Sequence, residues 1–149
     1  PDDADFLQRA QAEIAINVVA PLHLTTLFLQ LPSADVIMNV TSGLSFIPLV
    51  KAPVYSATKA FFHSFTLSLR ELVRPRNIEV IEVIPPALNT DLGGKGIHDH
   101  APPVAEFIDA VFAQLKEGST EVSSGFSATV SQAGQDVLRT AFQRMNRIG

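Results

Sequence analysis

Cysteine and tryptophan are both absent from this chain of 149 residues, and its single tyrosine is Tyr55. A chain without cysteine forms no disulfide and offers no thiolate as a nucleophile or a metal ligand. Proteins of reducing compartments typically lack disulfides, so we expect a cytoplasmic location.

Positive charge is also scarce, because 11 lysine and arginine residues stand against 15 aspartate and glutamate residues and the net charge is -4. The basic residues form no cluster along the sequence. This composition does not favour nucleic acid or an anionic membrane surface as a partner.

Long hydrophobic runs are missing as well. The longest candidate, residues 14–31, is interrupted by Asn17, Pro21, His23 and a threonine pair, so we expect no membrane-spanning segment. The chain starts with an acidic stretch where a signal peptide would be basic. Hydrophobic residues nevertheless make up 46% of the chain, which is enough for one globular domain with a core.

The hydrophobic pattern predicts alternating helices and strands. Short apolar runs rich in β-branched residues predict strands, and apolar residues that recur every three to four positions predict helices. Strands that alternate with helices indicate an α/β fold with a parallel sheet. The predicted helices cover residues 3–29, 54–74, 102–117 and 135–145, and the predicted strands cover residues 35–40, 78–84 and 121–126.

Two details of the predicted helices bear on packing. Pro21 has no N–H group, so the carbonyl of Asn17 loses its helical partner and the first helix is expected to be interrupted there. In the second helix, an apolar stripe along one side predicts the buried face. The stripe consists of Phe61, Phe65, Leu69 and Leu72.

The most informative segment, Tyr55-Ser56-Ala57-Thr58-Lys59, opens the second helix. Tyr55 and Lys59 are one helical turn apart, which places their side chains on one face with Cβ atoms about 5–6 Å apart. A phenol ordinarily has a pKa of about 10, and an adjacent ammonium group lowers it by favouring the phenolate. The pair is therefore predicted to act as a general acid/base on a hydroxyl or carbonyl oxygen.

Other polar residues accompany this pair. Ser42 follows the strand at 35–40, and ligands of open α/β sheets bind beyond the carboxyl ends of strands. Asn17 lies in the first helix, and Pro85-Pro86-Ala87-Leu88-Asn89-Thr90 follows the strand at 78–84. With these motifs, the chain resembles the short-chain dehydrogenase/reductase family, and within it the DltE-type oxidoreductases.

The resemblance implies an oxidoreductase that transfers hydride between a nicotinamide cofactor and a carbonyl or alcohol substrate. Tyr55 would be the acid/base, Ser42 would orient the substrate oxygen, and Lys59 would tune the phenol and bind the nicotinamide ribose. Asn17 matches the family position whose main chain holds a water linked to the lysine.

The resemblance also implies NADP or NAD as the cofactor. The family motif Pro-Gly-x-x-x-Thr faces the nicotinamide ring, and Pro85 and Thr90 match it, with Leu88 supplying a backbone contact. Pro86 stands where the family usually has glycine. Because proline cannot adopt the positive φ that glycine can, this loop is expected to differ in conformation.

The resemblance covers nearly the whole chain but only about the second half of a family member. Residues 1–149 would be the catalytic half of a Rossmann-like, doubly wound parallel sheet flanked by helices. The N-terminal, adenosine-binding half would be absent, and the first residue, Pro1, suggests a fragment. Family members commonly form homodimers through the helices that here contain Asn17 and Tyr55. The alternative is a catalytically inactive dimerisation or binding module.

Rival chemistries find less support in the sequence. Ser56 and Lys59 spell the Ser-x-x-Lys signature of penicillin-recognising enzymes, but the companion motifs are missing. The glycine-rich segment 92–96 lacks the strand-before, helix-after setting of a phosphate-binding loop. His98, Asp99 and His100 are adjacent and have poor spacing for a metal, so no metal site is expected.

Overall fold

The computed structural model describes residues 3–147. Its centre is a parallel sheet in the order β1-β2-β3, formed by β1 (Val36–Val40), β2 (Glu79–Ile84) and β3 (Glu121–Ser123). Val40 is paired with Val83, and Val83 is paired with Val122. The predicted α/β fold with a parallel sheet is therefore confirmed.

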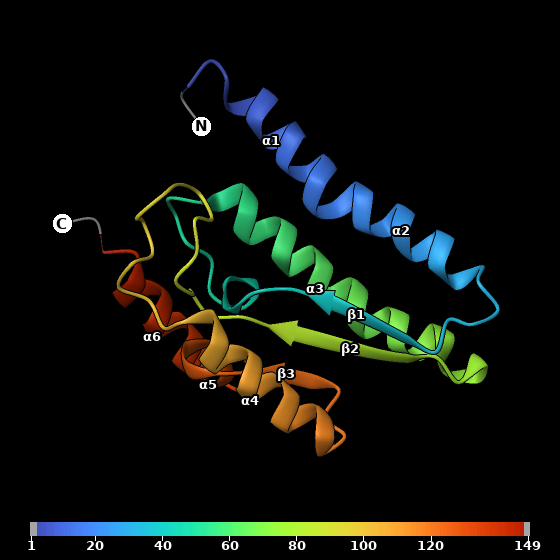
Figure 1. Ribbon diagram of the computed structural model, residues 1–149. Helices are drawn as coiled ribbons and strands as arrows, with labels where there is room; N and C mark the ends of the chain where they lie inside the picture. The colour runs from blue at the N-terminus through green and yellow to red at the C-terminus, as the bar shows by residue number, and fades with distance from the viewer. Residues whose placement is uncertain (1–2, 148–149) are drawn as a thin grey trace.

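Helices cover both faces of this sheet (Figure 1). The connection α3 (Pro53–Val73) lies on one face and ends in the 3-10 turn η3 (Arg74–Arg76), and α4 (Val104–Lys116) lies on the other face. A long N-terminal helix runs along the outer side of α3. The C-terminal helices α5 (Gly125–Ser131) and α6 (Gln135–Met145) gather at the end of the sheet where β1 and β2 finish.

The N-terminal helix consists of α1 (Phe6–Ile14), the π-helical turn η1 (Ala15–Val19) and α2 (Ala20–Leu29). The interruption expected before Pro21 is the π-helical turn η1. The N–H of Ala20 donates to the carbonyl of Ala15, five residues back, so the wider turn absorbs the proline without breaking the helix.

This continuity corrects one prediction. The helix Phe6–Leu29 has 24 residues and a hydrophobic window with mean hydropathy 1.5, which is long and apolar enough to cross a membrane. Sequence reasoning counted Asn17 and Pro21 as breaks, but neither carries a charge and the π turn carries the helix through both. A helix of this length and composition can also pack against protein. Within this chain, only 6% of that window is buried.

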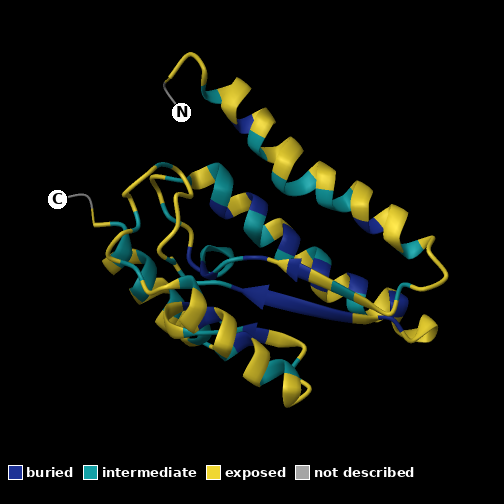
Figure 2. Cartoon of the chain, viewed as in Figure 1, coloured by how far each residue is buried: buried dark blue, intermediate teal, exposed yellow. Residues whose placement is uncertain are grey.

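The hydrophobic core has two parts, one on each side of β2. Leu69 and Val73 of α3 pack against Ile78 and Val80 on one side. The other part is formed by α4 and the strands, and its buried members are Ile81, Val83, Phe107, Val111 and Val122. β2 is therefore buried on both faces, as parallel strands usually are, and it appears dark blue over most of its length in Figure 2.

The buried face of α3 is only partly the predicted stripe: Leu69 is buried and Phe65 packs against the core, but Phe61 and Leu72 do not face inward. Phe61 and Leu72 are 45% and 73% exposed, whereas Phe62 is 5% exposed and Leu69 only 3%. Residues Thr58, Phe62, Thr66, Leu69 and Val73 face inward. The prediction followed the most apolar side chains, but threonines occupy the inner face because their hydroxyl groups form hydrogen bonds there.

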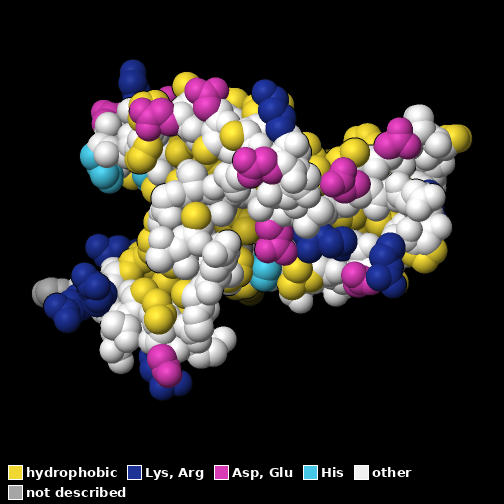
Figure 3. Space-filling model, turned by 90° about the horizontal axis from the view of Figure 1, so that it is seen from below, with side chains coloured by type: hydrophobic (Ala, Val, Ile, Leu, Met, Phe, Trp, Pro, Cys, Tyr) yellow, Lys and Arg dark blue, Asp and Glu magenta, His cyan; other side chains and the backbone are white. Residues whose placement is uncertain are grey.

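β1 forms an open edge of the sheet, and one of its faces is uncovered. Val36, Met38 and Val40 are 49%, 48% and 51% exposed, because α4 covers only β2 and β3. A groove of about 660 Å³ runs along β1, lined by its residues, α2 and Phe62. Hydrophobic side chains also show between charged ones on the face seen in Figure 3.

The segment after β3 differs from its prediction. A strand was expected to continue to residue 126, but β3 ends at Ser123 and α5 begins at Gly125, which has φ +53°. α5 packs against η2 (Gly43–Ser45), where a Cβ on Gly43 would come within 2.5 Å of the Ser127 hydroxyl oxygen. Only glycine permits this close approach, so Gly43 lets α5 support the loop that follows β1.

Candidate active site

Tyr55 and Lys59 lie on the first two turns of α3, which begins at Pro53 as expected for a proline at a helix start. The Lys59 ammonium nitrogen lies 5.6 Å from the centre of the Tyr55 ring. Both side chains are partly buried between α3 and neighbouring elements. The predicted pair is therefore brought together on one helix face.

Ser42 reaches this pair from the end of β1. Its hydroxyl oxygen accepts the Leu44 N–H at 3.1 Å, which leaves the hydroxyl hydrogen available for donation. The Ser42 hydroxyl group, by hydrogen bonding, favours the phenolate and lowers the pKa of Tyr55. The Gly43 N–H donates to the Pro85 carbonyl at 3.2 Å, so the end of β2 holds the turn that carries Ser42.

The pKa of Tyr55 is nevertheless raised above its ordinary value of 10.0. Burial is the main cause, since the charged phenolate loses more hydration than the neutral phenol. Glu13 of α1 adds to the rise, and the Ser42 hydrogen bond opposes it. The prediction that Lys59 lowers this pKa is therefore wrong for this structure, because burial dominates.

Lys59 directs its ammonium group inward. The nitrogen donates to the Val40 carbonyl at 3.0 Å, and burial lowers the pKa of the lysine. Val40, two residues before Ser42, is thus joined directly to the residue one turn after Tyr55. Val40 lies at the open edge of the sheet, so Lys59 supplies a donor to a carbonyl that no other described strand reaches.

Asn17 is connected to the same site through Thr58. The Asn17 amide nitrogen donates to the Thr58 hydroxyl at 3.2 Å, and that hydroxyl donates to the Tyr55 carbonyl at 2.8 Å. Thr58 is 3% exposed and was missed from the sequence. Its position inside the Tyr-x-x-x-Lys segment, on the side that faces the N-terminal helix, was the available signal.

The absence of tryptophan makes the Tyr55 pKa directly measurable. Tyr55 is the only phenol in the chain, so its ultraviolet absorbance change with alkali reports one group. We expect a titration midpoint above 10, and a still higher midpoint in Ser42→Ala, which loses the opposing hydrogen bond. Circular dichroism at each pH checks that the chain remains folded. A midpoint below 10 in the folded chain would contradict the buried environment.

The segment expected to face the nicotinamide ring follows β2 and borders the same end of the sheet (Figure 1). Pro85 is held by its bond from Gly43, and Leu88 packs its side chain against the α4 side of the core. Thr90 is exposed and accepts the Leu92 N–H at 3.4 Å. Pro85 and Leu88 therefore lie on a fixed support, while the Thr90 hydroxyl lies at the surface.

Sequence reasoning missed a buried polar network beside these residues. Glu82 of β2 is fully buried, and its carboxyl group accepts the Thr41 hydroxyl at 2.6 Å. Nδ1 of His63 lies 2.9 Å and 3.0 Å from the two carboxyl oxygens. The Phe46 ring packs over His63 with ring centres 4.6 Å apart. A glutamate inside a run of apolar β-branched residues was the signal that this strand carries a buried polar contact.

This network should make stability depend on pH. The hydrogen bond that the His63 ring donates to Glu82 raises the pKa of His63 above 6.5, so the added stability is complete below pH 6.5 and is lost as pH rises through the raised value. We expect His63→Gln to flatten the fall in unfolding free energy as pH rises above 6.5, measured by urea denaturation. The control is His23→Gln, which removes an exposed histidine of α2. Equal slopes for His63→Gln and the unmodified chain would rule out this contribution.

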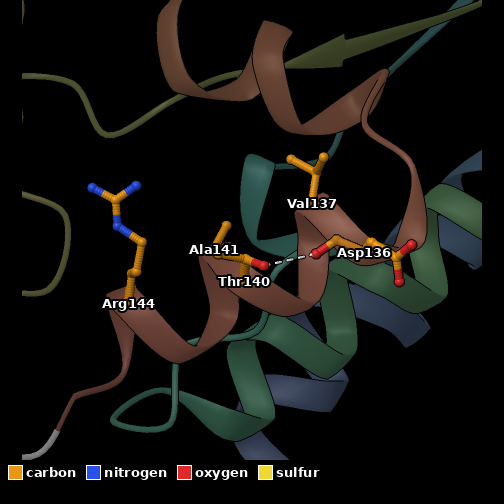
Figure 4. A pocket seen from close by; sticks show the side chains of 5 residues that line it. All are labelled: Asp136, Val137, Thr140, Ala141 and Arg144. Carbon is orange, nitrogen blue, oxygen red and sulfur yellow. Dashed lines mark hydrogen bonds between the residues drawn. The ribbon is translucent and has the colours of Figure 1, made fainter.

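The structure gives no support to the rival nucleophile at Ser56 or to a metal site. Ser56 is 1% exposed, donates to the Ala52 carbonyl at 2.9 Å and accepts the Leu49 N–H at 3.1 Å, so it serves the helix start. Across residues 3–147, no group of three His, Asp or Glu side chains could hold a metal ion. A shallow hollow of about 320 Å³ lies on α6, where Val137, Ala141 and Arg144 project (Figure 4), and it contains none of the predicted site residues.

Comparison with known proteins places this geometry in a family. The short chain dehydrogenase family model matches residues 3–100, which include Asn17, Ser42, Tyr55, Lys59 and the Pro85–Thr90 segment. The chain belongs to the short-chain dehydrogenase family. A curated relative named "Uncharacterized oxidoreductase DltE", from Bacillus subtilis (strain 168), is 38% identical over 143 residues, and the match covers 90% of this chain.

Solved structures of short-chain dehydrogenases have the same fold. The enzyme from Burkholderia cenocepacia in complex with NADP has a TM-score of 0.79 and 27% identity over 95% of this chain. The enzyme from Sphingobium yanoikuyae in complex with NADPH has a TM-score of 0.68 and 23% identity over 91% of this chain, which shows the fold alone. The matches cover 56% of the curated relative and 60% and 56% of these two structures, so the chain spans little more than half of each.

Proposed function

We propose that these residues form the proton-transfer half of a nicotinamide-dependent oxidoreductase acting on a carbonyl or alcohol substrate. The observation that carries the proposal is the Lys59 ammonium, which lies 5.6 Å from the centre of the Tyr55 ring and donates to the Val40 carbonyl, two residues before Ser42. When two hydroxyl groups lie close together, both can bind one substrate oxygen atom and one of them can protonate it. Family membership supports the same reaction class.

The proposed roles are those that the family resemblance implies, and the positions of the residues support them. Ser42 donates to the substrate oxygen and fixes its distance from the phenol. Tyr55 gives its proton to that oxygen as negative charge develops on it. Lys59 and Tyr55 hold the ribose of NADP or NAD, whose nicotinamide supplies the hydride when bound. Asn17, held by Thr58, steadies the helix pair beside the proton donor.

The raised Tyr55 pKa favours the reductive direction. At neutral pH the phenol keeps its proton, so it is ready to donate to the alkoxide that forms during carbonyl reduction. Alcohol oxidation needs the phenolate and is expected to accelerate toward alkaline pH. The ribose-binding role also calls for the Lys59 ammonium to leave the Val40 carbonyl or to serve both partners.

The open edge of β1 supports the proposal that this chain is the catalytic half of a larger sheet. Its three outward side chains are apolar and about half exposed, which is unusual for a parallel strand. Further strands that pair with β1, together with the helices that connect them, would cover these side chains and carry the adenosine part of the cofactor. The relatives, of which the chain spans little more than half, have the additional length for such strands.

Titration of NADPH into the protein, followed by nicotinamide fluorescence, tests the cofactor proposal. We expect binding that weakens in Lys59→Met, which keeps the aliphatic stem but loses the ammonium donor. Reduction of a panel of aldehydes and ketones, followed by consumption of NADPH, tests the chemistry. Binding unaffected by Lys59→Met would contradict the assigned ribose contact.

The second candidate is a catalytically inactive dimerisation or binding module, favoured by the apolar outer surface of the N-terminal helix and α3. Ile16, Val19, Leu27 and Phe61 are 69%, 56%, 47% and 45% exposed. Either candidate is compatible with a homodimer through these helices and with a cytoplasmic location. A chain that dimerises but neither binds NADPH nor consumes it would favour the module.

A further inference from the structure

Glu82 has an unusual position for a carboxyl group. It is 0% exposed, in the middle of a strand whose other inward residues are apolar. Its side chain lies between the sheet and α3, where water does not reach. A buried carboxyl group is costly unless donors surround it, so its partners are expected to be specific.

The two partners come from the two elements that carry the site. Thr41, which donates to Glu82 at 2.6 Å, directly precedes Ser42. His63, whose Nδ1 lies 2.9 Å from the same oxygen, follows Lys59 by one turn of α3 and Tyr55 by two. One carboxyl group therefore joins the end of β1 to the helix face that holds the acid/base pair.

The bond to Thr41 is short and shielded from solvent. Thr41 is 2% exposed, and its N–H also donates to the Val83 carbonyl at 2.9 Å, so backbone and side chain of one residue are both fixed by β2. Ser42 follows in an extended conformation, with φ −167° and ψ 156°. A displacement of Thr41 would move the Ser42 hydroxyl relative to the phenol.

We propose that Glu82 is a positioning residue, which sets the distance between the Ser42 and Tyr55 hydroxyl groups by holding Thr41 and His63 at once. This inference rests on the proposed function for its catalytic meaning, but its geometric claim is independent of turnover. Glu82 touches neither hydroxyl and acts through Thr41.

A second link between β1 and α3 provides a matched control. The Asn39 amide donates to the Thr66 hydroxyl at 3.0 Å, and Thr66 is 0% exposed. Thr41→Val and Thr66→Val each replace a buried threonine by its apolar isostere and remove one polar link between these elements. Only Thr41 adjoins Ser42.

The test is the pKa of Tyr55, read from its absorbance as the only phenol in the chain. Because the Ser42 bond lowers this pKa, we expect Thr41→Val to raise it in the same direction as Ser42→Ala, while Thr41→Ser and Thr66→Val leave it unchanged. The double variant Thr41→Val/Ser42→Ala should match Ser42→Ala alone, since Thr41 acts through Ser42. Additive shifts, or equal shifts in Thr41→Val and Thr66→Val, would overturn the proposal.

Glu82→Gln extends the test and replaces Thr41→Val if that variant does not fold. The amide keeps the size of the carboxyl group but cannot accept both donors equally, so the Tyr55 pKa should rise. The NMR chemical shifts of the Tyr55 ring carbons at neutral pH compare the environment of the phenol among the same variants. In an active protein, both variants should lower kcat with little change in KM. Turnover that survives Tyr55→Phe would refute the proposed function, whereas an unshifted Tyr55 pKa in Glu82→Gln would refute the positioning role.

Discussion

Replacement of Tyr55 by Phe should lower kcat for carbonyl reduction by about a hundred- to ten-thousand-fold. The phenol is the proposed proton donor, and phenylalanine keeps the ring that packs beside Lys59 while removing only the hydroxyl group. The measurement is NADPH consumption with a reducible aldehyde or ketone, with kcat and KM determined separately. NADPH binding should weaken but not disappear, because the Tyr55 hydroxyl contact to the ribose is lost while the ammonium of Lys59 remains.

The fold provides the control for this variant. The unfolding midpoint of Tyr55→Phe should stay close to that of the unmodified chain, since the change removes one hydroxyl group from a partly buried side chain. Ser42→Ala, which retains the phenol, should lose less activity than Tyr55→Phe. Activity that remains within a factor of about two in Tyr55→Phe would remove the phenol from the mechanism.

Replacement of Phe62 by Ala should lower the unfolding free energy by about 3–5 kcal/mol. The Phe62 ring is 5% exposed and stacks on Phe65 with ring centres 5.8 Å apart, so its removal leaves a cavity beside the sheet. A domain of this size is typically stable by about 5–15 kcal/mol, and much of that would be lost. Urea denaturation followed by circular dichroism measures the difference.

Its neighbour Phe61 is the matched control. The same substitution at Phe61, which is 45% exposed, should change the unfolding free energy of the monomer by about 1 kcal/mol or less. Measurement at a protein concentration where the chain is monomeric separates this effect from any loss of association through the outer surface of α3. Equal losses at both positions would show that the inner face of α3 is misassigned.

The positions of the catalytic candidates followed from the sequence because they depend on local geometry. Tyr55 and Lys59 share a helix face at their spacing in any α-helix, and Ser42 lies at a strand end that a parallel sheet turns toward the ligand side. The strands, the starts of α3 and α4, and the proline-bearing turn in the N-terminal helix were predictable for the same reason. The structure brings Tyr55 and Lys59 together on α3, and Lys59 donates to a carbonyl two residues before Ser42.

The inner face of α3 was only partly predictable from hydrophobicity, which identified Leu69 and Phe65 correctly. The threonines Thr58 and Thr66 point inward and Phe61 points outward, because the inner face meets polar partners on the N-terminal helix and on β1. Periodicity identifies a face by its apolar residues and ignores hydroxyl groups that find buried partners. For the same reason, the hydrophobic pattern of β2 did not indicate that Glu82 is buried and hydrogen-bonded.

The sequence by itself determined which residue types lie one helical turn apart and which follow a strand, and these local relations specified the Tyr55, Lys59 and Ser42 constellation. Only the tertiary structure decided the pKa of Tyr55, the carbonyl that Lys59 bonds and the carboxyl group that joins β1 to α3. The physical reason is that burial and long-range hydrogen bonds depend on which segments pack together. Spacing along the chain carries no information about how much water each group loses there.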